Sequence, residues 1–354
     1  MAEAASAVLD DAGRIGRLDS SDMLGAIGRM GAMVAEGWEA AAGTPRPRRV
    51  PSALVVAGMG GSAIGGDLLR ALLAPDAPVP VVVVRDERLP AFVGPQTLVV
   101  ACSYSGNTEE TLAAYDAARA RRAPLVAVTS GGALAARARA DGHPVVAVPG
   151  GLQPRAALGL LLLPLVRLAC ELGLGLPEPQ IGRARALLDG LAGRWGPAVP
   201  ATDNPAKRLA AAASGLPAIY AASPATEPVA LRWKTQINEN AKRPAVWGAL
   251  PEIAHNEIVG WEGRGPGAPE VAIVLRDADD GPRAGVRVEA VRALLGDRAR
   301  PVAEVWSQGA DRLERLLSLV LFGDFVSAYL AVLGGVDPTP VAAIDRIKRL
   351  LAGP

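Results

Sequence analysis

Five short apolar runs in the first half of the chain contain no alternation of polar and apolar residues. They are rich in valine and are separated by helix-like stretches of alanine and leucine; the runs are ALVVAG (53–58), VPVVVVR (79–85), TLVVACS (97–103), PLVAVTS (124–130) and HPVVAVP (143–149). A strand without polar alternation is buried on both faces, and regular interleaving with helices is typical of a parallel sheet. The pattern therefore predicts an α/β domain with helices on both faces of its sheet.

A second, less regular alternation occupies the other half of the chain. Its strand-like runs lie at 216–223, 271–277 and 302–307, and its helical patterns lie at 227–241, 287–295 and about 311–333. Near the N-terminus, an apolar stripe recurs at helical spacing and is typical of a core-facing helix; its members are Met23, Ile27, Met30, Val34 and Trp38. We therefore expect two α/β domains in tandem, with helical segments outside them.

These patterns divide the chain into five expected parts. They are an N-terminal helical segment (1–50), a first α/β domain (51–175), a linker with a short helix (176–205), a second α/β domain (206–336) and a C-terminal helix (337–354). Proline clusters mark the linker, and Pro340 marks the start of the last helix.

Composition narrows the functional classes. The chain has 354 residues, of which 21% are charged, and its formal net charge is +1. A balance this close to neutral creates no field that would favour nucleic acid or an anionic membrane surface. We interpret arginine runs such as RPRRV (46–50) as a solvated face. We expect neither nucleic acid nor a membrane among the partners.

Cysteine usage and the N-terminal residues predict a cytoplasmic protein. Cys102 and Cys170 lie in apolar runs, are too few for a disulfide framework and form no CxxC motif. The first residues carry acids and lack the basic and apolar segments of a signal peptide. The most apolar stretch (156–170) contains Pro164 and Arg167 and is too short to span a bilayer, so we expect a buried core helix there.

The first of two glycine-rich loops follows the first strand-like run. Its sequence, AGMGGSAIGGDLL, fits the GxGxxG dinucleotide fingerprint imperfectly, and no acidic residue clearly ends the next strand. A tight turn from strand to helix needs glycine in any case. The loop therefore supports a dehydrogenase only poorly.

The second loop, SYSGNTEETL, gathers hydroxyl groups where a strand turns into a helix. Ser103, Ser105 and Thr108 can donate to a tetrahedral anion, and a helix that begins near Thr108 adds free amide groups. Ser62 of the first loop can add a further hydroxyl, because both loops emerge at the carboxyl edge of the sheet. The alternative is that Ser105 or Asn107 only caps the helix. Neither loop contains lysine or arginine, so the cluster favours a neutral donor site for a phosphate monoester.

Several segments together resemble a known family. SYSGNTEET matches the S-x-S-G-x-T-x-E pattern of sugar isomerase (SIS) domains, which bind phosphosugars through those hydroxyls. Five further segments resemble the bifunctional phosphoglucose/phosphomannose isomerases: GMGGSAIGGDLL, QPRAALG, INENAKRPA, PEIAHNEIVGW and DPTPV. The resemblance implies two tandem SIS-type domains, each a mainly parallel sheet flanked by helices in an α/β/α sandwich. It assigns the substrate phosphate to Gly60, Gly61, Ser62, Ser103, Ser105 and Thr108.

Glu239 is the candidate base. Aldose–ketose isomerisation needs a group that moves a proton between C1 and C2 of the sugar. Glu239 lies between Asn238 and Asn240 in a helical pattern, and the resemblance makes it this base; the alternative is an exposed helix glutamate. The resemblance also implies that His255 opens the sugar ring and is supplied across the interface of a homodimer. His143, the other histidine, precedes Pro144 at a strand start and is interpreted as structural.

Three more residues receive roles from the resemblance. Arg155 in QPRAALG is implied to stabilise the enediolate, and Lys348 is implied to assist ring opening. For Lys348 the alternative is a lysine that interacts with the dipole at a helix end. Thr339 in DPTPV corresponds to a threonine that leaves room for the mannose epimer. The chain has two histidines and no ligand cluster, so we expect no metal and no cofactor.

The predicted function is the interconversion of glucose 6-phosphate and mannose 6-phosphate with fructose 6-phosphate. The two aldoses differ only at C2, the carbon that loses its proton, so both pass through the same cis-enediol(ate). One alternative is an isomerase for another phosphosugar, and a second is a sensor that binds phosphosugars without catalysis. The presence of Glu239, His255 and Arg155 together favours an enzyme, because binding alone needs none of them.

Overall fold

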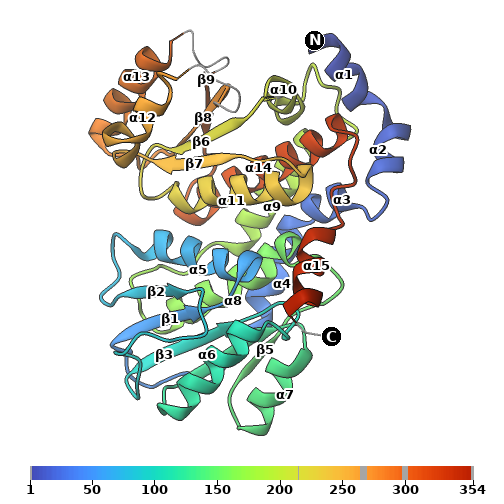
Figure 1. Cartoon of the computed structure of the whole chain (residues 1–354). Coiled ribbons are helices and arrows are strands. Elements are labelled where there is room, and N and C mark those ends of the chain that lie inside the picture. The colour runs from blue at the N-terminus through green and yellow to red at the C-terminus, as the bar shows by residue number, and fades with distance from the viewer. Residues whose placement is uncertain (1, 214, 264–268, 297–301, 352–354) are drawn as a thin grey trace. The chain divides into compact units, whose positions relative to one another are not determined.

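The computed structural model describes residues 2–213, 215–263, 269–296 and 302–351 (Figure 1). The chain forms two compact units, each built around one parallel sheet. The first domain comprises residues 29–190 and 308–318, and the second comprises 1–28, 191–307 and 319–354. Parallel sheets flanked by helices confirm the predicted fold class. The boundaries of the two units differ from the ranges expected from the sequence, because the N-terminal helical segment is divided between the two units after residue 28.

A five-stranded parallel sheet in the order β2-β1-β3-β4-β5 forms the centre of the first domain. Its strands are β1 Ala53–Ala57, β2 Val81–Val84, β3 Thr97–Cys102, β4 Leu125–Thr129 and β5 Val145–Ala147. Each strand lies inside one of the five apolar runs, and every residue of β1, β3 and β4 is buried. Helices cover both faces of the sheet, which leaves no face for polar side chains. The five predicted strands are therefore confirmed.

Helices complete the three layers of the first domain. They are α4 Met30–Ala40, α5 Gly60–Leu73, α6 Glu109–Ala120, α7 Gly132–Ala140, the 3₁₀ helix η1 Pro154–Ala156 and α8 Leu158–Glu171; α9 Ile181–Trp195 begins in this domain. Figure 1 shows α6 and α7 on one face of the sheet and α5 and α8 on the other. On the α6 side, Val99, Ala101 and Tyr115 belong to one buried apolar cluster.

Helix α8 is the buried core helix expected from the most apolar stretch of the chain. Pro164 lies inside it, and the residues from Leu158 to Val166 are all buried. Helix α4 packs directly on α8, because a Cβ at Gly159 would lie only 2.8 Å from the Cβ of Met33. The backbone nitrogen of Val34, a member of the apolar stripe predicted near the N-terminus, would lie 2.9 Å from the same Cβ.

A four-stranded parallel sheet in the order β7-β6-β8-β9 forms the centre of the second domain. Its strands are β6 Pro217–Ala221, β7 Val246–Ala249, β8 Val271–Arg276 and β9 Val302–Trp306. Strands β6, β8 and β9 lie in the runs that predicted them. Strand β7 was not predicted, because its run of four residues, VWGA, contains a single valine and includes Gly248.

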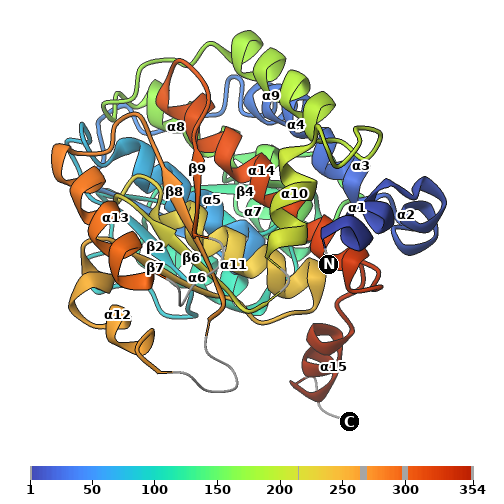
Figure 2. The same cartoon turned by 90° about the horizontal axis from the view of Figure 1, so that it is seen from above.

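The helices of the second domain come from three separate parts of the chain. They are α1 Ala2–Asp10, α2 Ala12–Leu18, α3 Met23–Gly28, α10 Pro205–Ala212, α11 Glu227–Ala241, η2 Glu252–His255, α12 Glu257–Gly260, α13 Pro282–Leu295, α14 Arg312–Leu333 and α15 Ala342–Leu351. Helix α1 lies beside α10 (Figure 2), where Lys207 Nζ donates to Asp10 Oδ1 at 2.9 Å. Helix α13 and the α11–α14 pair cover opposite faces of the sheet (Figure 1).

Helix α14 is long and apolar enough to cross a bilayer by length and composition alone, and no other helix in the described ranges is. However, 94% of its most apolar segment is buried inside the structure. Its first residues, 312–318, belong to the first domain, and the remainder belongs to the second. It is therefore interpreted as a core helix.

Candidate active site

The two hydroxyl-bearing loops of the first domain lie side by side because their strands are neighbours. Ala57 at the end of β1 pairs with Ala101 of β3, so the loops after these parallel strands emerge at the same edge of the sheet. Gly60 and Gly61 form the first turn of α5, and Ser62 follows them. The backbone N–H of Tyr104 donates to Ser62 Oγ at 3.1 Å, which joins the second loop directly to the first.

Hydrogen bonds inside the second loop bring its hydroxyls together. Ser103 Oγ and Thr108 Oγ1 are 2.9 Å apart, and Ser103 Oγ also accepts from the Gly106 N–H at 3.2 Å. Ser103 is buried, Thr108 is half-buried and Ser105 is exposed. The three predicted phosphate-binding hydroxyls therefore range from the buried base of the loop to its exposed tip.

The helix that follows this loop is not capped by the side chains that could have capped it. Thr108 holds the position before α6, and its side chain accepts no hydrogen bond from the amides of the first turn. Ser105 Oγ accepts from the Asn107 N–H at 3.3 Å, and Asn107 Oδ1 accepts from the Ala133 N–H at 2.9 Å. The alternative that Ser105 or Asn107 only caps α6 is thus not supported. The first amides of α6 keep their donors directed at the loop's edge of the sheet.

Arg155 lies directly beside the first loop. It occupies the middle of η1, is only 3% exposed, and its backbone nitrogen would lie 2.9 Å from a Cβ at Gly61. Gly61 therefore permits the contact between α5 and η1. Sequence chemistry alone does not distinguish Arg155 from the many other arginines, whereas its burial next to the first hydroxyl-bearing loop does.

Burial also affects the protonation state of Cys102, the last residue of β3. Burial raises the pKa of the Cys102 thiol to about 12, so this group, which adjoins Ser103, stays protonated near neutral pH. The pKa of Cys170 is raised to about 12 as well, by burial first and then by the nearby Glu178 and Glu171. Neither thiol is a nucleophile at neutral pH.

In the second domain, Glu239 lies half-buried in the last turn of α11. Lys242 ends the helix in the left-handed conformation, with a φ of 56°, and its Nζ donates to Glu239 O at 2.7 Å. The two flanking amides donate elsewhere: Asn238 Nδ2 to Arg243 O at 2.7 Å, and Asn240 Nδ2 to Ser327 Oγ at 2.9 Å. These amides therefore fix the end of the helix around Glu239.

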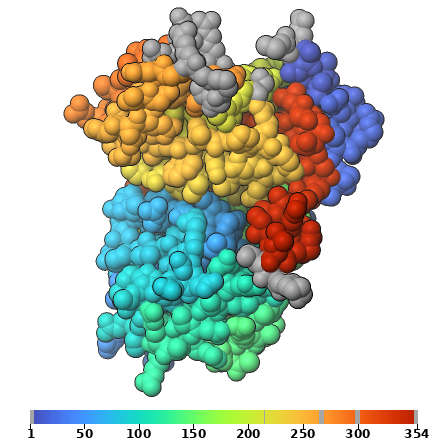
Figure 3. Space-filling view, in the orientation of Figure 1, coloured from blue at the N-terminus to red at the C-terminus, as the bar shows by residue number. Residues whose placement is uncertain are grey.

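Thr339 comes close to the same helix end, whereas Lys348 lies on an exposed helix. Lys242 Nζ also donates to Pro338 O at 2.9 Å, which places the segment before Thr339 against the end of α11. Every described side chain of α15 is exposed, Lys348 included. Part of this helix is visible as the red surface of Figure 3. The roles of Thr339 and Lys348 stay predictions.

His255 ends η2 and is exposed, within a segment that is firmly attached to the sheet. Tyr220 of β6 donates its hydroxyl to Glu257 Oε1 at 2.8 Å, and Trp261 Nε1 donates to the Tyr220 oxygen at 2.8 Å. This attachment anchors the chain that follows the histidine to the sheet. Sequence reasoning missed Tyr220 and Trp261, because an aromatic residue in an apolar run gives no sign of such a contact.

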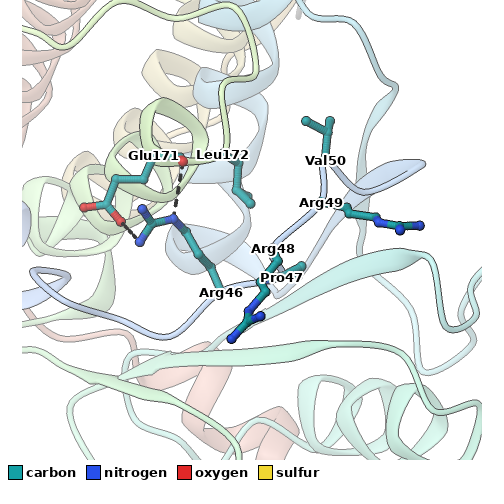
Figure 4. A pocket seen from close by; sticks show the side chains of 7 residues that line it. All are labelled: Arg46, Pro47, Arg48, Arg49, Val50, Glu171 and Leu172. Carbon is teal, nitrogen blue, oxygen red and sulfur yellow. Dashed lines mark hydrogen bonds and ion pairs between the residues drawn. The ribbon is translucent and has the colours of Figure 1, made fainter.

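A cavity elsewhere in the first domain contains none of the predicted site residues (Figure 4). Its volume is about 400 Å³, and it is lined by Arg46, Pro47, Arg48, Arg49, Val50, Glu171 and Leu172. Arg46 Nη1 pairs with Glu171 Oε2 at 2.9 Å, and the Arg48 and Arg49 side chains point in different directions. The three arginines do not converge on one point, as expected for a solvated face.

Comparison with known proteins connects these residues to a family. A model of the bacterial phospho-glucose isomerase C-terminal SIS domain matches residues 202–351. A bifunctional phosphoglucose/phosphomannose isomerase of Caldicellulosiruptor bescii is 46% identical over 303 residues, which cover 84% of this chain and 89% of that protein. The chain belongs to the bifunctional phosphoglucose/phosphomannose isomerase family. A member of this family from Aquifex aeolicus is 36% identical over 84% of this chain and 90% of its own length.

Two further comparisons concern a relative with a different activity and a solved structure. A D-glucosamine-6-phosphate 4-epimerase of Sulfolobus acidocaldarius is 36% identical over 57% of this chain and 61% of that protein. Among solved structures, a glucose-6-phosphate isomerase like protein from Thermus thermophilus has a TM-score of 0.60 at 24% identity, covering 96% of this chain and 98% of that one. At this identity the likeness shows the fold.

Proposed function

We propose that this chain interconverts glucose 6-phosphate and mannose 6-phosphate with fructose 6-phosphate through a cis-enediol(ate). The observation that carries the proposal is the 46% identity to a bifunctional phosphoglucose/phosphomannose isomerase over 84% of the chain. The hydroxyl cluster of the first domain supports it, because such a cluster suits the phosphate that all three sugars share.

The loops of the first domain hold the phosphate. Ser103, Ser105 and Thr108 donate hydroxyl groups to its oxygens, and the uncapped first turn of α6 adds backbone N–H groups and a partial positive charge. Ser62 fixes the second loop through the Tyr104 N–H. These groups bind the unreactive end of the sugar and take no part in the proton transfer.

Glu239 acts as the base that moves a proton between C1 and C2. Removal of the C2 proton of an aldose leaves an enediolate, and returning the proton to C1 gives the ketose. Arg155 stabilises the negative charge that develops on the enediolate oxygen. Lys348 assists the opening of the sugar ring, and Thr339 leaves space for either epimer at C2.

The ring opens with the help of His255 of the partner subunit in a homodimer. An imidazole titrates near neutrality and suits proton delivery to the ring oxygen. The exposure of His255 on a well-anchored segment supports this role, because a residue that serves a neighbouring subunit must face outward. We place the enzyme in the cytoplasm, where its two cysteines stay reduced.

A coupled assay on the purified, chelator-treated protein tests the proposal. We expect turnover of both glucose 6-phosphate and mannose 6-phosphate to fructose 6-phosphate. Glu239→Gln keeps the shape of the side chain and removes the base, so kcat should fall by about 100-fold or more with KM nearly unchanged. Micromolar sugar-phosphate binding without turnover would favour the sensor instead. Turnover of glucosamine 6-phosphate alone would favour another sugar, as the epimerase relative suggests.

A further inference from the structure

Helix α11 buries three polar side chains at intervals of four residues. Arg232, Gln236 and Asn240 are 1%, 1% and 0% exposed, and we call them the polar stripe of α11. Residues four apart lie on one face of a helix, and a face buried against another helix is ordinarily apolar. The polar stripe therefore requires a specific explanation.

Each member of the polar stripe makes a directional contact with α14. Arg232 Nε and Nη2 donate to Asp324 Oδ1 and Oδ2 at 3.1 and 2.7 Å, and Gln236 Nε2 donates to Asp324 Oδ1 at 2.9 Å. Asn240 Nδ2 donates to Ser327 Oγ at 2.9 Å, and Ser327 Oγ donates in turn to Asp324 O at 2.7 Å. Three successive turns of α11 are thus tied to one turn of α14.

A buried ion pair is weak evidence for a role in stability. The Arg232 and Asp324 side chains are 1% and 2% exposed, so their attraction is offset by the cost of removing both charges from water. Replacement of such a buried pair by apolar residues is commonly neutral or stabilising. A bidentate guanidinium–carboxylate contact fixes the orientation of the two side chains, because it tolerates little rotation of either partner.

A further contact limits the movement of α11 along α14. Trp233 Nε1 donates to Leu319 O at 2.9 Å, and a Cβ at Gly323 would overlap the same nitrogen. The indole therefore occupies the space that a side chain at position 323 would fill. The position of α11 on α14 is set along the helix axis as well as around it.

We propose that the polar stripe positions Glu239, an inference that rests on the proposed role of Glu239 as the base. Glu239 directly precedes Asn240, so the rotation of α11 sets the direction of its side chain. A helix side chain ends about 6 Å from the axis, and a rotation of about 10° moves its carboxyl group by about 1 Å. A displacement of about 1 Å can lower a rate by about 100-fold. Arg232, Gln236 and Asp324 are accordingly positioning residues for the isomerisation.

A triple variant removes the contacts of the polar stripe to the Asp324 carboxylate and keeps the packing. In Arg232→Met, Gln236→Met and Asp324→Leu together, the buried volume is nearly retained and both charges of the pair are removed. We expect a urea midpoint equal to or above that of the wild type, a kcat for glucose 6-phosphate lower by about tenfold or more, and a KM within about twofold. A crystal structure of the variant should show an intact α11 with the Glu239 carboxyl group displaced by about 1 Å.

The matched control is another ion pair of the same domain, Lys207 with Asp10. Its lysine side chain is 1% exposed and its aspartate side chain is 38% exposed, and it joins α10 to α1. Lys207→Met with Asp10→Leu should leave kcat unchanged. A merely structural role would predict equal effects of the two replacements.

Wild-type kcat in a folded triple variant would overturn the proposal. If the triple variant does not fold, Gln236→Met takes its place, because it removes one contact to Asp324 and leaves the Arg232–Asp324 pair intact. This variant should lose kcat by a smaller factor at unchanged KM, and full activity would again contradict the inference. An inactive wild type would refute the proposed function instead, and an active Glu239→Gln would refute the role of Glu239 as the base. The displacement of residue 239 in the crystal structure would then still test the polar stripe.

Discussion

At position 61, the packing of the first domain requires a residue without a side chain. The backbone of η1 approaches Gly61 so closely that an added Cβ would lie 2.9 Å from Arg155 N and from Pro154 C. Backbone atoms cannot move aside as the end of a flexible side chain can. Any side chain at position 61 must therefore displace Arg155 or the first turn of α5.

Gly61→Ala should lower kcat/KM by about tenfold or more, because it moves Arg155 relative to the phosphate loops. Gly182→Ala is the matched control: it is also the second residue of a first-domain helix, and nothing lies within 4 Å of its Cβ position. That control should keep full activity and gain up to about 1 kcal/mol of stability. Steady-state kinetics and urea unfolding measure both effects, and equal activities would contradict the contact.

The two cysteines should react slowly in the native protein. With pKa values of about 12 for Cys102 and Cys170, only about one thiol in 10,000 is ionised at pH 8, and the thiolate is the reactive form. Labelling with a thiol reagent at pH 8 should therefore be far slower than in urea. Rapid labelling of Cys102 in the native state would show that its burial is not maintained.

At the scale of elements, the segment after His255 is attached to the second sheet by side chains. The Tyr220 hydroxyl donates to Glu257 and accepts from Trp261, so one residue of β6 holds both the start of α12 and the chain after it. Burial raises the pKa of Tyr220, so its hydroxyl keeps its proton and remains a donor to Glu257 at all working pH values.

Tyr220→Phe should loosen this segment without unfolding the sheet. The variant leaves Glu257 and Trp261 without their shared partner, which costs about 1–3 kcal/mol locally. Hydrogen exchange of residues 252–262 should quicken while β8 stays protected. Tyr115→Phe is the control, because it removes a hydroxyl bond to Asp141 in the first domain and should leave this segment unchanged. Unchanged exchange in Tyr220→Phe would show that the segment is held by other contacts.

The sequence predicts elements well where burial alone decides them. The valine-rich runs predict β1, β3 and β4 because a strand covered on both faces has to be continuously apolar. Strand β7 was not predicted because its short run, VWGA, contains a single valine and includes Gly248. The hydroxyl cluster of Ser103 and Thr108 was found from its residue types, whereas the burial of Arg155 and the polar stripe of α11 depend on packing between distant segments.

At the scale of the whole molecule, the homodimer and the position of His255 can be tested together. If Glu239 of one subunit works with His255 of the partner subunit, Glu239→Gln and His255→Ala proteins are each inactive. A mixed dimer contains one site with both native residues. After subunit exchange, half of the dimers are mixed, so about a quarter of the wild-type activity should return.

Light scattering should accompany the mixing experiment and give a mass near twice the 36.3 kDa of the chain. Either variant incubated alone is the control and should stay inactive. A dimer without recovery of activity would place His255 in the site of its own subunit. A monomer would refute the shared site altogether.

The way in which the chain is divided between the two domains also has a consequence for biosynthesis. The second domain contains the first helices of the chain, and these helices pack on a helix that comes much later in the sequence. Asp10 of α1 contacts Lys207 of α10, 197 residues further along the chain. At about 5–20 residues per second, a ribosome needs about 10–40 s to make the intervening chain. The N-terminal helices therefore leave the ribosome long before their partners exist, with Leu9 and Ile27, both buried in the finished fold, still exposed to water. Much of the first domain, which is continuous from residue 29 to 190, is made during that wait.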